Sequence, residues 1–526
     1  MLHPGTQRPR LDWRLPHVDR AALAGARELV WRDRRLGAAV ALGVALEVAA
    51  VLALLMPRGP ITTTEGLGTM VAGLLVGVVG GFTLRSRWAM LLAPLAFVAA
   101  YELVRVGTDG PTVDGIHLST YGLIALVVGR GVHGVLALLP MALGAALGAG
   151  YARHVRGTPA RHGWARAPLY ARRAVTALVA VGLVALAVAV ARPATTDPIL
   201  GPDGEPLAGS IAELTRVELG GHDLALMIRG HSIESPVLLF LAGGPGGSEL
   251  GAMRRHLEAL EQDFVVVTFD QRGAGKSYDA LDPASTLTLD GAVEDTLALT
   301  DYLRDRFGED RIYLVGQSWG STLGVLAVQR RPELYAAFVG VGQMVSQRET
   351  DRIFYRDTLA WARETGKGDL VARLTDIGPP PYATILPYET ALSYEHEVYP
   401  YDHSRNSEGE GGFSENLLVE EYTLLEQVNA LGAMMDTFSV LYPQLQEIDF
   451  RRDADELEVP VYLVQGRHEA AGRAVLADEW FEQLEAPAKT MVVLETSGHR
   501  PLFEQPARFH EVMTQTVLAE TAPARR

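Results

Sequence analysis

The chain has 526 residues, no cysteine and a formal net charge of −16. Its length predicts two or three folding units, and the absence of cysteine excludes disulfides and thiolate metal sites while leaving the redox character of the compartment open. Residues 1–192 contain 20 Arg, no Lys and 9 acidic residues, a net charge of +11, so the remainder carries −27. Such a sign change predicts that the two parts lie in different surroundings.

Residues 1–35 form a polar, Arg-rich segment, and residues 36–192 are dominated by apolar stretches. Because so long a polar segment precedes the first apolar stretch, we expect no cleaved signal peptide. Stretches of roughly 20 apolar residues are long enough to cross a bilayer as helices. The predicted spans are Leu36–Met56, Gly66–Leu84, Trp88–Val106, Val132–Ala152 and Ala174–Ala191. A further apolar stretch, Ile116–Gly129, is short and typical of a re-entrant or interfacial segment.

The distribution of arginines indicates the direction in which these spans cross the membrane. Most of the arginines lie in residues 1–35 and in the connections on the same side of the membrane as that segment, including Arg85, Arg87 and six between 153 and 173. The loops on the opposite side hold Arg58 and Arg130. Positively charged loops remain in the cytoplasm. The sequence therefore predicts a multi-pass cell-membrane protein with five crossings, a cytoplasmic N-terminus and everything after Arg192 outside. A sixth crossing at 116–129 would turn the six-arginine loop outward, against this rule.

Ionisable residues within the spans leave a second role open. Glu47 lies in the first span, and Glu102 and Arg105 lie near the end of the third. Such groups often mark a transport or sensing pathway. However, Glu102 and Arg105 are three residues apart, a spacing that lets them pair on a helix, and no internal repeat supports a transporter. We favour a membrane anchor, with a non-catalytic sensor or transporter that only binds a ligand as the alternative.

After a Pro- and Gly-rich linker at 193–214, residues 215–520 alternate short apolar runs with helical patterns. Runs without strict polar alternation are typical of parallel strands buried on both faces. These runs lie at 237–242, 264–269, 312–316, 337–342, 461–466 and 491–495. Between about 345 and 456 the strand rhythm stops, which indicates an inserted helical lid. The expected fold is α/β with an open sheet, preceded by an all-α transmembrane region.

The hexapeptide GQSWGS at 316–321 fits the pattern G-x-S-x-G between a buried strand and a helical pattern. A sharp strand-to-helix turn needs small residues at Gly316 and Gly320, and it raises the serine above the sheet. The sequence therefore predicts Ser318 as a nucleophile rather than part of an ordinary tight turn.

A serine nucleophile needs a base and an acid, which follow it in the order Ser, acid, His in this topology. His499 in SGHRPLFEQP follows the last predicted strand and is the candidate base, since His222, His256 and His510 lie in hairpin or helix patterns. Glu469 follows the strand VYLVQG and is the candidate acid. Asp478 is the alternative acid, although it falls in a helical pattern.

The turn GGPGG at 243–247 can bring backbone N–H groups close to a bound carbonyl. We predict the N–H groups of Gly244 and Trp319 as oxyanion donors. The segment DQRGAGKS at 270–277 ends like a phosphate-binding loop, but Asp270 stands where that motif needs glycine, and GGPGG lacks dinucleotide-binding spacing. No H-E-x-x-H zinc motif occurs. We expect no cofactor, no metal and no nucleic-acid partner.

Taken in order, GGPGG, DQRGAGKS, GQSWGS and SGHRPLFEQP resemble the prolyl aminopeptidases (proline iminopeptidases) of the α/β-hydrolase fold, over about residues 215–517. The resemblance implies Ser318 as nucleophile, His499 as base, an acid at 469, and Gly244 and Trp319 as oxyanion donors. Three features depart from the family: Ala242 replaces its usual histidine, Glu469 replaces its usual aspartate, and the lid does not align. Family members hold the substrate amine with lid carboxylates, for which the candidates are Glu389, Glu395, Glu397, Glu420 and Glu421.

These observations predict a membrane-anchored serine hydrolase, in contact with the lipid bilayer, that releases N-terminal residues from short peptides through an acyl-enzyme. An esterase or amidase with the same three side chains is the nearest alternative.

Overall fold

The computed structural model describes residues 31, 33–156, 167–399, 415 and 419–522. Residues 400–414 and 416–418 of the predicted lid lie outside these residues. The chain divides into two compact units. We call them the helical unit (Met1–Leu55, Thr69–Arg105 and Leu136–Val184) and the sheet unit (Met56–Gly68, Val106–Val135 and Ala185–Arg526).

The apolar stretches form helices at the predicted places. They are α2 (Arg34–Leu55), α3 (Thr63–Leu84), α4 (Ala89–Val104), α5 (Thr120–Leu126), α6 (Val132–Val155) and α7 (Ala167–Ala191). In the described residues, four helices are long and apolar enough to cross a membrane, namely Arg34–Leu55, Thr63–Leu84, Thr120–Val155 and Ala167–Ala191, while α4 is shorter. The stretch predicted as a separate re-entrant segment instead joins the next helix, because a π-helical turn at Val127–Gly131 carries the helix past two glycines without a break.

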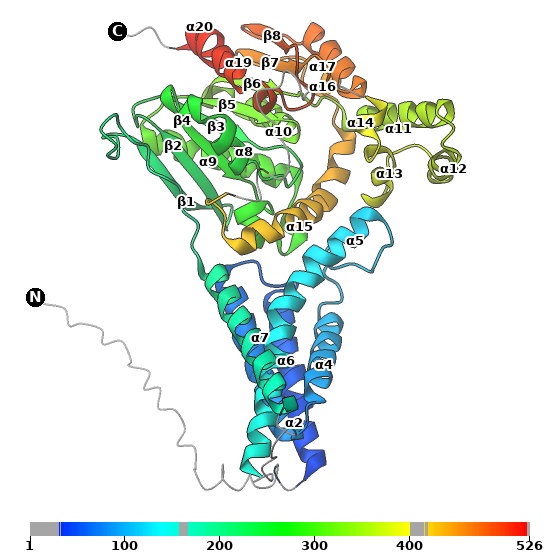
Figure 1. The fold of residues 1–526 in the computed structure, drawn as a ribbon. Coiled ribbons are helices and arrows are strands. Elements are labelled where there is room, and N and C mark those ends of the chain that lie inside the picture. The colour runs from blue at the N-terminus through cyan, green and yellow to red at the C-terminus, as the bar shows by residue number, and fades with distance from the viewer. Residues whose placement is uncertain (1–30, 32, 157–166, 400–414, 416–418, 523–526) are drawn as a thin grey trace, which may run out of the picture. The chain divides into compact units, whose positions relative to one another are not determined.

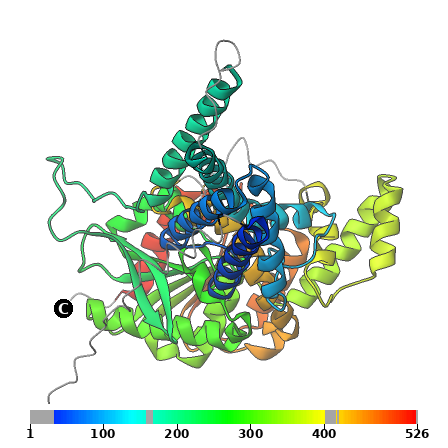
Figure 2. The ribbon, with the colours of Figure 1, turned by 90° about the horizontal axis from the view of Figure 1, so that it is seen from below.

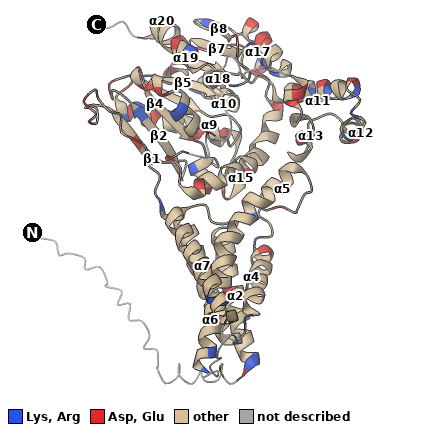
Figure 3. Cartoon of the chain, viewed as in Figure 1, with Lys and Arg blue, Asp and Glu red and all other residues tan. Residues whose placement is uncertain are grey.

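Glycines let α3 and α6 approach closely within the helical unit. A Cβ added at Gly77 would lie 1.9 Å from the carbonyl oxygen of Met141, and one at Gly81 would lie 2.1 Å from that of Ala145. From the other helix, a Cβ at Gly148 would lie 2.2 Å from the carbonyl oxygen of Val78. Small residues at such spacing are how helices pack where apolar lipid removes the hydrophobic drive. Figure 3 shows arginines gathered at one end of these helices.

The sheet unit contains an eight-stranded sheet in the order β1-β2-β4-β3-β5-β6-β7-β8 (Figure 1). The strands are β1 (Ile211–Leu219), β2 (His222–Gly230), β3 (Val237–Leu241), β4 (Val265–Asp270), β5 (Ile312–Gln317), β6 (Tyr335–Val341), β7 (Val461–Gly466) and β8 (Lys489–Leu494). The six predicted strands pair in parallel, whereas β1 pairs with β2, and β2 with β4, antiparallel. The antiparallel hairpin at the sheet edge was not among the predicted strands.

Helices cover both faces of this sheet, which explains why the central strands are apolar throughout. One face packs against α9 (Leu289–Phe307), α10 (Trp319–Arg330) and α17 (Ala471–Gln483). The other packs against α8 (Leu250–His256), α18 (Pro501–Glu504), α19 (Pro506–Glu511) and the π-helical turn Val512–Leu518, which continues into α20 (Ala519–Thr521). Because parallel strands share a direction, the loops that follow β3, β5, β7 and β8 emerge at one edge.

A helical insertion separates β6 from β7, as predicted for the lid. It comprises α11 (Gln347–Glu364), α12 (Gly368–Ile377), α13 (Glu389–Leu392), α14 (Glu395–Val398), α15 (Leu424–Leu441) and α16 (Phe450–Asp453). Figure 2 shows α11 and α12, in yellow-green, to one side of the strands. A capping box fixes the start of α15, where the Thr423 side chain accepts from the Glu426 N–H and the Glu426 side chain accepts from the Thr423 N–H.

Two segments from the N-terminal third are built into the sheet unit. Asp436 of α15 is fully buried and accepts hydrogen bonds from Arg58 Nη1 at 2.6 Å, from Thr112 Oγ1 at 2.6 Å and from the Tyr278 hydroxyl at 2.7 Å. Arg58 also pairs with Asp282 at 3.1 Å. Although burial alone would lower it, these anions hold the pKa of Arg58 above its ordinary value. The loop between α2 and α3 thus supplies the counter-charge for a buried lid carboxylate.

Candidate active site

Ser318 occupies the sharp turn between β5 and α10. Its backbone has φ 53° and ψ −118°, a conformation that a non-glycine residue adopts only when its surroundings impose it. A Cβ at Gly316 would lie 2.2 Å from the carbonyl oxygen of Gly320, and one at Gly320 would lie 2.0 Å from that of Leu241. Glycine is therefore required at both positions of the motif, and the turn presents the serine at the sheet edge.

Three side chains predicted from separate motifs form one hydrogen-bonded chain. The distance from Ser318 Oγ to His499 Nε2 is 2.9 Å, and that from His499 Nδ1 to Glu469 Oε2 is 2.6 Å. Gly342, with φ +56°, fits beneath the imidazole, since a Cβ there would lie 3.1 Å from His499 Nδ1. In this arrangement the imidazole can accept the serine proton on one nitrogen while the carboxylate holds the other.

Glu469 is buried but remains ionised. Its side chain is 1% exposed. Burial alone would raise its pKa, but Arg473 and His499 outweigh burial and hold the pKa of Glu469 at about 2. Its Oε1 accepts from Arg473 Nε at 2.7 Å and from the backbone N–H of Ala470 at 2.8 Å. The glutamate therefore carries a full negative charge beside His499 at neutral pH.

The loop after β3 lies close to the serine, since a Cβ at Gly243 would lie 3.4 Å from Ser318 Cβ. Gly244 has φ +131°, and a Cβ there would lie 2.5 Å from the Gly247 nitrogen. The N–H groups of Gly244 and Trp319 make no hydrogen bond to the part of the chain that the structure describes. The N–H of Gly243, in contrast, donates to Glu249 Oε2 at 3.0 Å. Two backbone donors thus remain free to bind an oxyanion.

The segment DQRGAGKS contacts the site, and its polar side chains have protein partners. Gln271 accepts from Trp319 Nε1 at 2.8 Å and donates to the carbonyl oxygen of Ala242 at 3.1 Å, so it joins the serine turn to the loop after β3. Lys276 Nζ donates to Glu426 at 2.7 Å, and Ser277 accepts from the Ala225 N–H at 2.9 Å. These groups of the lookalike loop are therefore engaged with protein partners.

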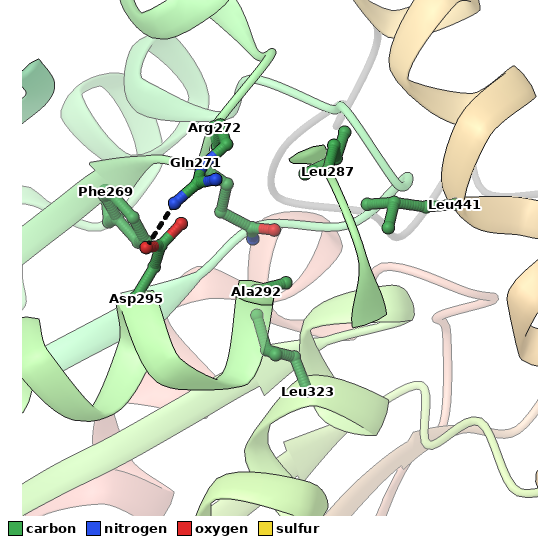
Figure 4. A pocket seen from close by; sticks show the side chains of 8 residues that line it. All are labelled: Phe269, Gln271, Arg272, Leu287, Ala292, Asp295, Leu323 and Leu441. Atoms are coloured by element: carbon green, nitrogen blue, oxygen red, sulfur yellow. Dashed lines mark hydrogen bonds and ion pairs between the residues drawn. The ribbon is translucent and has the colours of Figure 1, made fainter. Parts of the chain in front are cut away.

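A small cavity lies beside this segment. Figure 4 shows the Arg272–Asp295 ion pair, 2.7 Å long, at its wall, together with Gln271 and apolar side chains. Its volume is about 10 Å³, which is room for about one water molecule. Arg272 Nε and one oxygen of Asp295 have no hydrogen-bond partner among the described residues. The cavity is therefore suited to a buried water rather than to a substrate.

The alternative residues lie elsewhere. His256 pairs with Glu415 at 2.6 Å, and His510 pairs with Asp263 at 2.8 Å. His222 begins β2, which β4 and β3 separate from β5 in the sheet. Asp478 is exposed on α17, with no contact to the imidazole.

Most of the lid carboxylates proposed for a substrate amine already have protein partners. Glu395 pairs with Arg473 and Glu420 with Arg192, whereas Glu421 pairs with Arg254. Glu389 accepts from the backbone N–H of Tyr121 at 3.3 Å. Glu397 is exposed on α14.

Several supporting residues were missed from the sequence. Arg473 contacts the acid, and Arg500 Nη2 pairs at 2.7 Å with Glu249, which joins the histidine loop to the loop after β3. The Arg473 contact had a signal, because Glu469 and Arg473 are four residues apart at a helix start. Glu249 and Arg500 are 251 residues apart and carry no such pattern.

Comparisons with known proteins identify the family of this chain. The family model described as "alpha/beta hydrolase fold" matches residues 236–506, all within the sheet unit. The chain is 28% identical over 314 residues to the "Probable aminopeptidase YbaC" of Bacillus subtilis (strain 168), covering 59% of this chain and 98% of that protein. It is 32% identical over 124 residues to the "Probable proline iminopeptidase" of Leptolyngbya boryana, covering 24% of this chain and 36% of that protein.

Among solved structures, a proline iminopeptidase-related protein of Thermus thermophilus is 22% identical, with a TM-score of 0.43, and the match covers 60% of this chain and 100% of that one. A proline iminopeptidase of Mycobacterium smegmatis is 19% identical, with a TM-score of 0.44, over 59% of this chain and 99% of that one.

Proposed function

The chain belongs to the alpha/beta hydrolase family, and from this premise we propose that it is a membrane-anchored serine hydrolase that releases N-terminal residues from short peptides. The observation that carries the proposal is the hydrogen-bonded chain Ser318–His499–Glu469 beside two free backbone donors. The names of the aminopeptidase and proline iminopeptidase relatives support the choice of peptide substrates.

The proposed reaction passes through an acyl-enzyme. Ser318 Oγ attacks the scissile carbonyl carbon while His499 Nε2 takes the hydroxyl proton. The N–H groups of Gly244 and Trp319 bind the oxyanion of the tetrahedral intermediate, and each such donor contributes about 3 kcal/mol to catalysis. The imidazolium then gives its proton to the leaving amine as the C–N bond breaks. Water, deprotonated by the same imidazole, hydrolyses the ester and restores the Ser318 hydroxyl.

An esterase or amidase of the same fold is the second candidate function. The observation that favours it is the engagement of four of the five candidate lid carboxylates with protein groups. An aminopeptidase needs an anion for the substrate's free amine, so the peptidase proposal requires either the exposed Glu397 or one of the four engaged carboxylates to bind the amine.

Rates on three substrates separate the two functions. An aminopeptidase hydrolyses proline p-nitroanilide and loses this activity when the amine is acetylated. Equal rates on the free and acetylated amides, or hydrolysis of only a p-nitrophenyl ester, would instead assign an esterase or amidase.

A fluorophosphonate probe tests the serine mechanism itself. We expect labelling of the wild-type protein and none of Ser318→Ala. Failure of the folded wild-type protein to react would favour a domain that only binds a ligand.

We also propose that the sheet unit lies outside the cytoplasm. Residues 56–68, 106–135 and 185–526 belong to one compact unit, which supports placing them on one side of a bilayer crossed by the helices between them. The other connections hold Arg85, Arg87, Arg153 and Arg156, and loops rich in arginine remain cytoplasmic. Protease added to intact cells should therefore remove the sheet unit, and its full protection would reverse the orientation.

A further inference from the structure

We propose that Arg473 is a positioning residue that holds Glu469 in place for the reaction and connects it to the lid through Glu395. The inference rests on the proposed serine mechanism, but it does not depend on which substrate is cleaved. Arg473 lies in the first turn of α17, four residues after Glu469.

The two oxygens of Glu469 have different partners. Oε2 faces His499 Nδ1 at 2.6 Å, and Oε1 faces Arg473 Nε at 2.7 Å and the Ala470 N–H at 2.8 Å. The side chain of Arg473 is 9% exposed. With Oε1 fixed in this way, the carboxylate cannot rotate away from the imidazole, and Oε2 remains aimed at Nδ1.

The position of Arg473 in its own helix is electrostatically unfavourable. The first turn of a helix carries a partial positive charge and favours acidic side chains over basic ones. An arginine here works against helix stability, and its buried guanidinium is stabilised by Glu469 and Glu395 instead. Its placement is therefore explained by the carboxylates it contacts and not by the helix that carries it.

The far side of the guanidinium contacts the lid. Arg473 Nη2 pairs with Glu395 of α14, and its Cζ lies 5.0 Å from the centre of the Phe354 ring of α11. Asp351 of α11 and Tyr399 also interact with it electrostatically. The contacts run from lid helix to arginine to catalytic carboxylate, so a shift of α14 changes the environment of the acid directly.

Two substitutions that change the charge of this cluster should shift the pH dependence of the reaction in opposite directions. Removing a positive charge from a cluster favours its protonated form, and removing a negative charge disfavours it. Arg473→Gln should therefore raise the pH midpoint of a reaction that needs the unprotonated base. Glu395→Gln, which takes one anion from the guanidinium, should lower that midpoint.

The pH dependence of the fluorophosphonate labelling rate, measured on the full chain in detergent micelles, tests the proposal. Labelling needs the neutral imidazole but no particular substrate. For Arg473→Gln we expect the acidic midpoint to move upward by about 0.5 to 1 pH unit and the plateau rate to fall by about tenfold or more. Glu395→Gln should move the midpoint downward, and Arg473→Lys, which keeps the charge, should restore it to near the wild-type value.

Two control variants isolate the effect. Arg467→Gln removes the same charge from the loop that precedes α17, but Arg467 pairs with Glu495 at the surface, so the midpoint of this variant should equal that of the wild type. Burial raises the pKa of Asp351, a nearby acid, to about 6. Asp351→Asn tests whether this acid causes the fall in labelling rate at acidic pH.

Midpoints for Arg473→Gln and Glu395→Gln that equal the wild-type value would overturn the inference. A loss of stability in Arg473→Gln does not affect this conclusion, because Glu395→Gln changes none of the residues Ser318, His499 and Glu469. No labelling of the wild-type protein would instead overturn the proposed function.

Discussion

The two units of this protein solve the same packing problem in different ways. In the helical unit, α3 and α6 approach until a single added carbon at Gly77 would meet a backbone oxygen at 1.9 Å. In the sheet unit, strands that are apolar on both faces form the core, and buried charges are paired, as Arg58 is with Asp436. Close backbone approach suits a region where lipid provides no hydrophobic drive, whereas paired charges suit a region that also has to hold polar chemistry.

The largest effect should come from the proposed catalytic acid of the sheet unit. Glu469→Gln removes the charge that stabilises the imidazolium and can leave the imidazole in the wrong tautomer, so we expect a loss of about 10⁴-fold in kcat. The measurement is hydrolysis of a chromogenic amide or ester under saturating conditions. Asp478→Asn, on the helix that follows and equally conservative, should keep nearly full activity. A larger loss from Asp478→Asn would move the acid to that residue.

The second-largest effect should come from the buried ion pair between Arg58 and Asp436. Arg58→Gln leaves Asp436 buried without its counter-charge, and breaking such a pair costs about 3 to 5 kcal/mol of stability. Denaturant unfolding followed by near-UV circular dichroism measures the change. The double variant with Asp436→Asn should lose less than the sum of the two single variants. Additive losses would mean that the two groups do not stabilise each other.

This pair also explains why a fragment beginning at Thr196 is a poor substitute for the whole chain. Such a fragment lacks Arg58 and Thr112, two of the partners of the fully buried Asp436. It also lacks the carbonyl oxygen of Pro60, to which the Asn429 side chain donates. We expect it to be less stable than the full chain.

A smaller effect tests the helical unit. Gly77→Ala places a methyl group against the carbonyl oxygen of Met141 and should destabilise the unit by about 1 to 3 kcal/mol. Gly43→Ala, on α2, meets nothing within 4 Å and should be neutral or slightly stabilising. Thermal unfolding in detergent compares the two variants. Equal stability of the two variants would mean that close packing at Gly77 does not stabilise the helical unit.

How much the sequence could predict also differs between features. The strands, the lid and the chain of Ser318, His499 and Glu469 were accessible because parallel strands end at one edge, so motifs after β5, β7 and β8 had to meet there. The edge hairpin of β1 and β2 had a signal in the alternation of IAELTRVEL before two glycines, although it was not among the predicted strands.

Other contacts had no such signal. Arg58 and Asp436 are 378 residues apart, and each is an isolated charge in its own segment. Only the packing of the loop after α2 against α15 brings them together. The same holds for Arg473 and Glu395, since the place of α14 in the lid follows no pattern in the sequence.

The last effect concerns a buried acid whose hydrogen-bond partners are neutral side chains. Asp351 accepts hydrogen bonds from Tyr442, Gln446 and Gln347, but burial outweighs them and raises its pKa to about 6. Because the folded protein holds this proton more tightly than the unfolded chain, stability is greatest at acidic pH and falls as pH rises from about 4 to about 6. The loss should be about 3 kcal/mol.

Asp351→Asn should remove this dependence and make the protein more stable than wild type at neutral pH, provided that the amide keeps its three neighbours as partners. Denaturant unfolding at a series of pH values measures the difference between the two proteins. A difference that stays constant with pH would mean that Asp351 titrates normally. The sheet unit would then keep this buried carboxylate charged by hydrogen bonds from neutral side chains rather than by a direct ion pair.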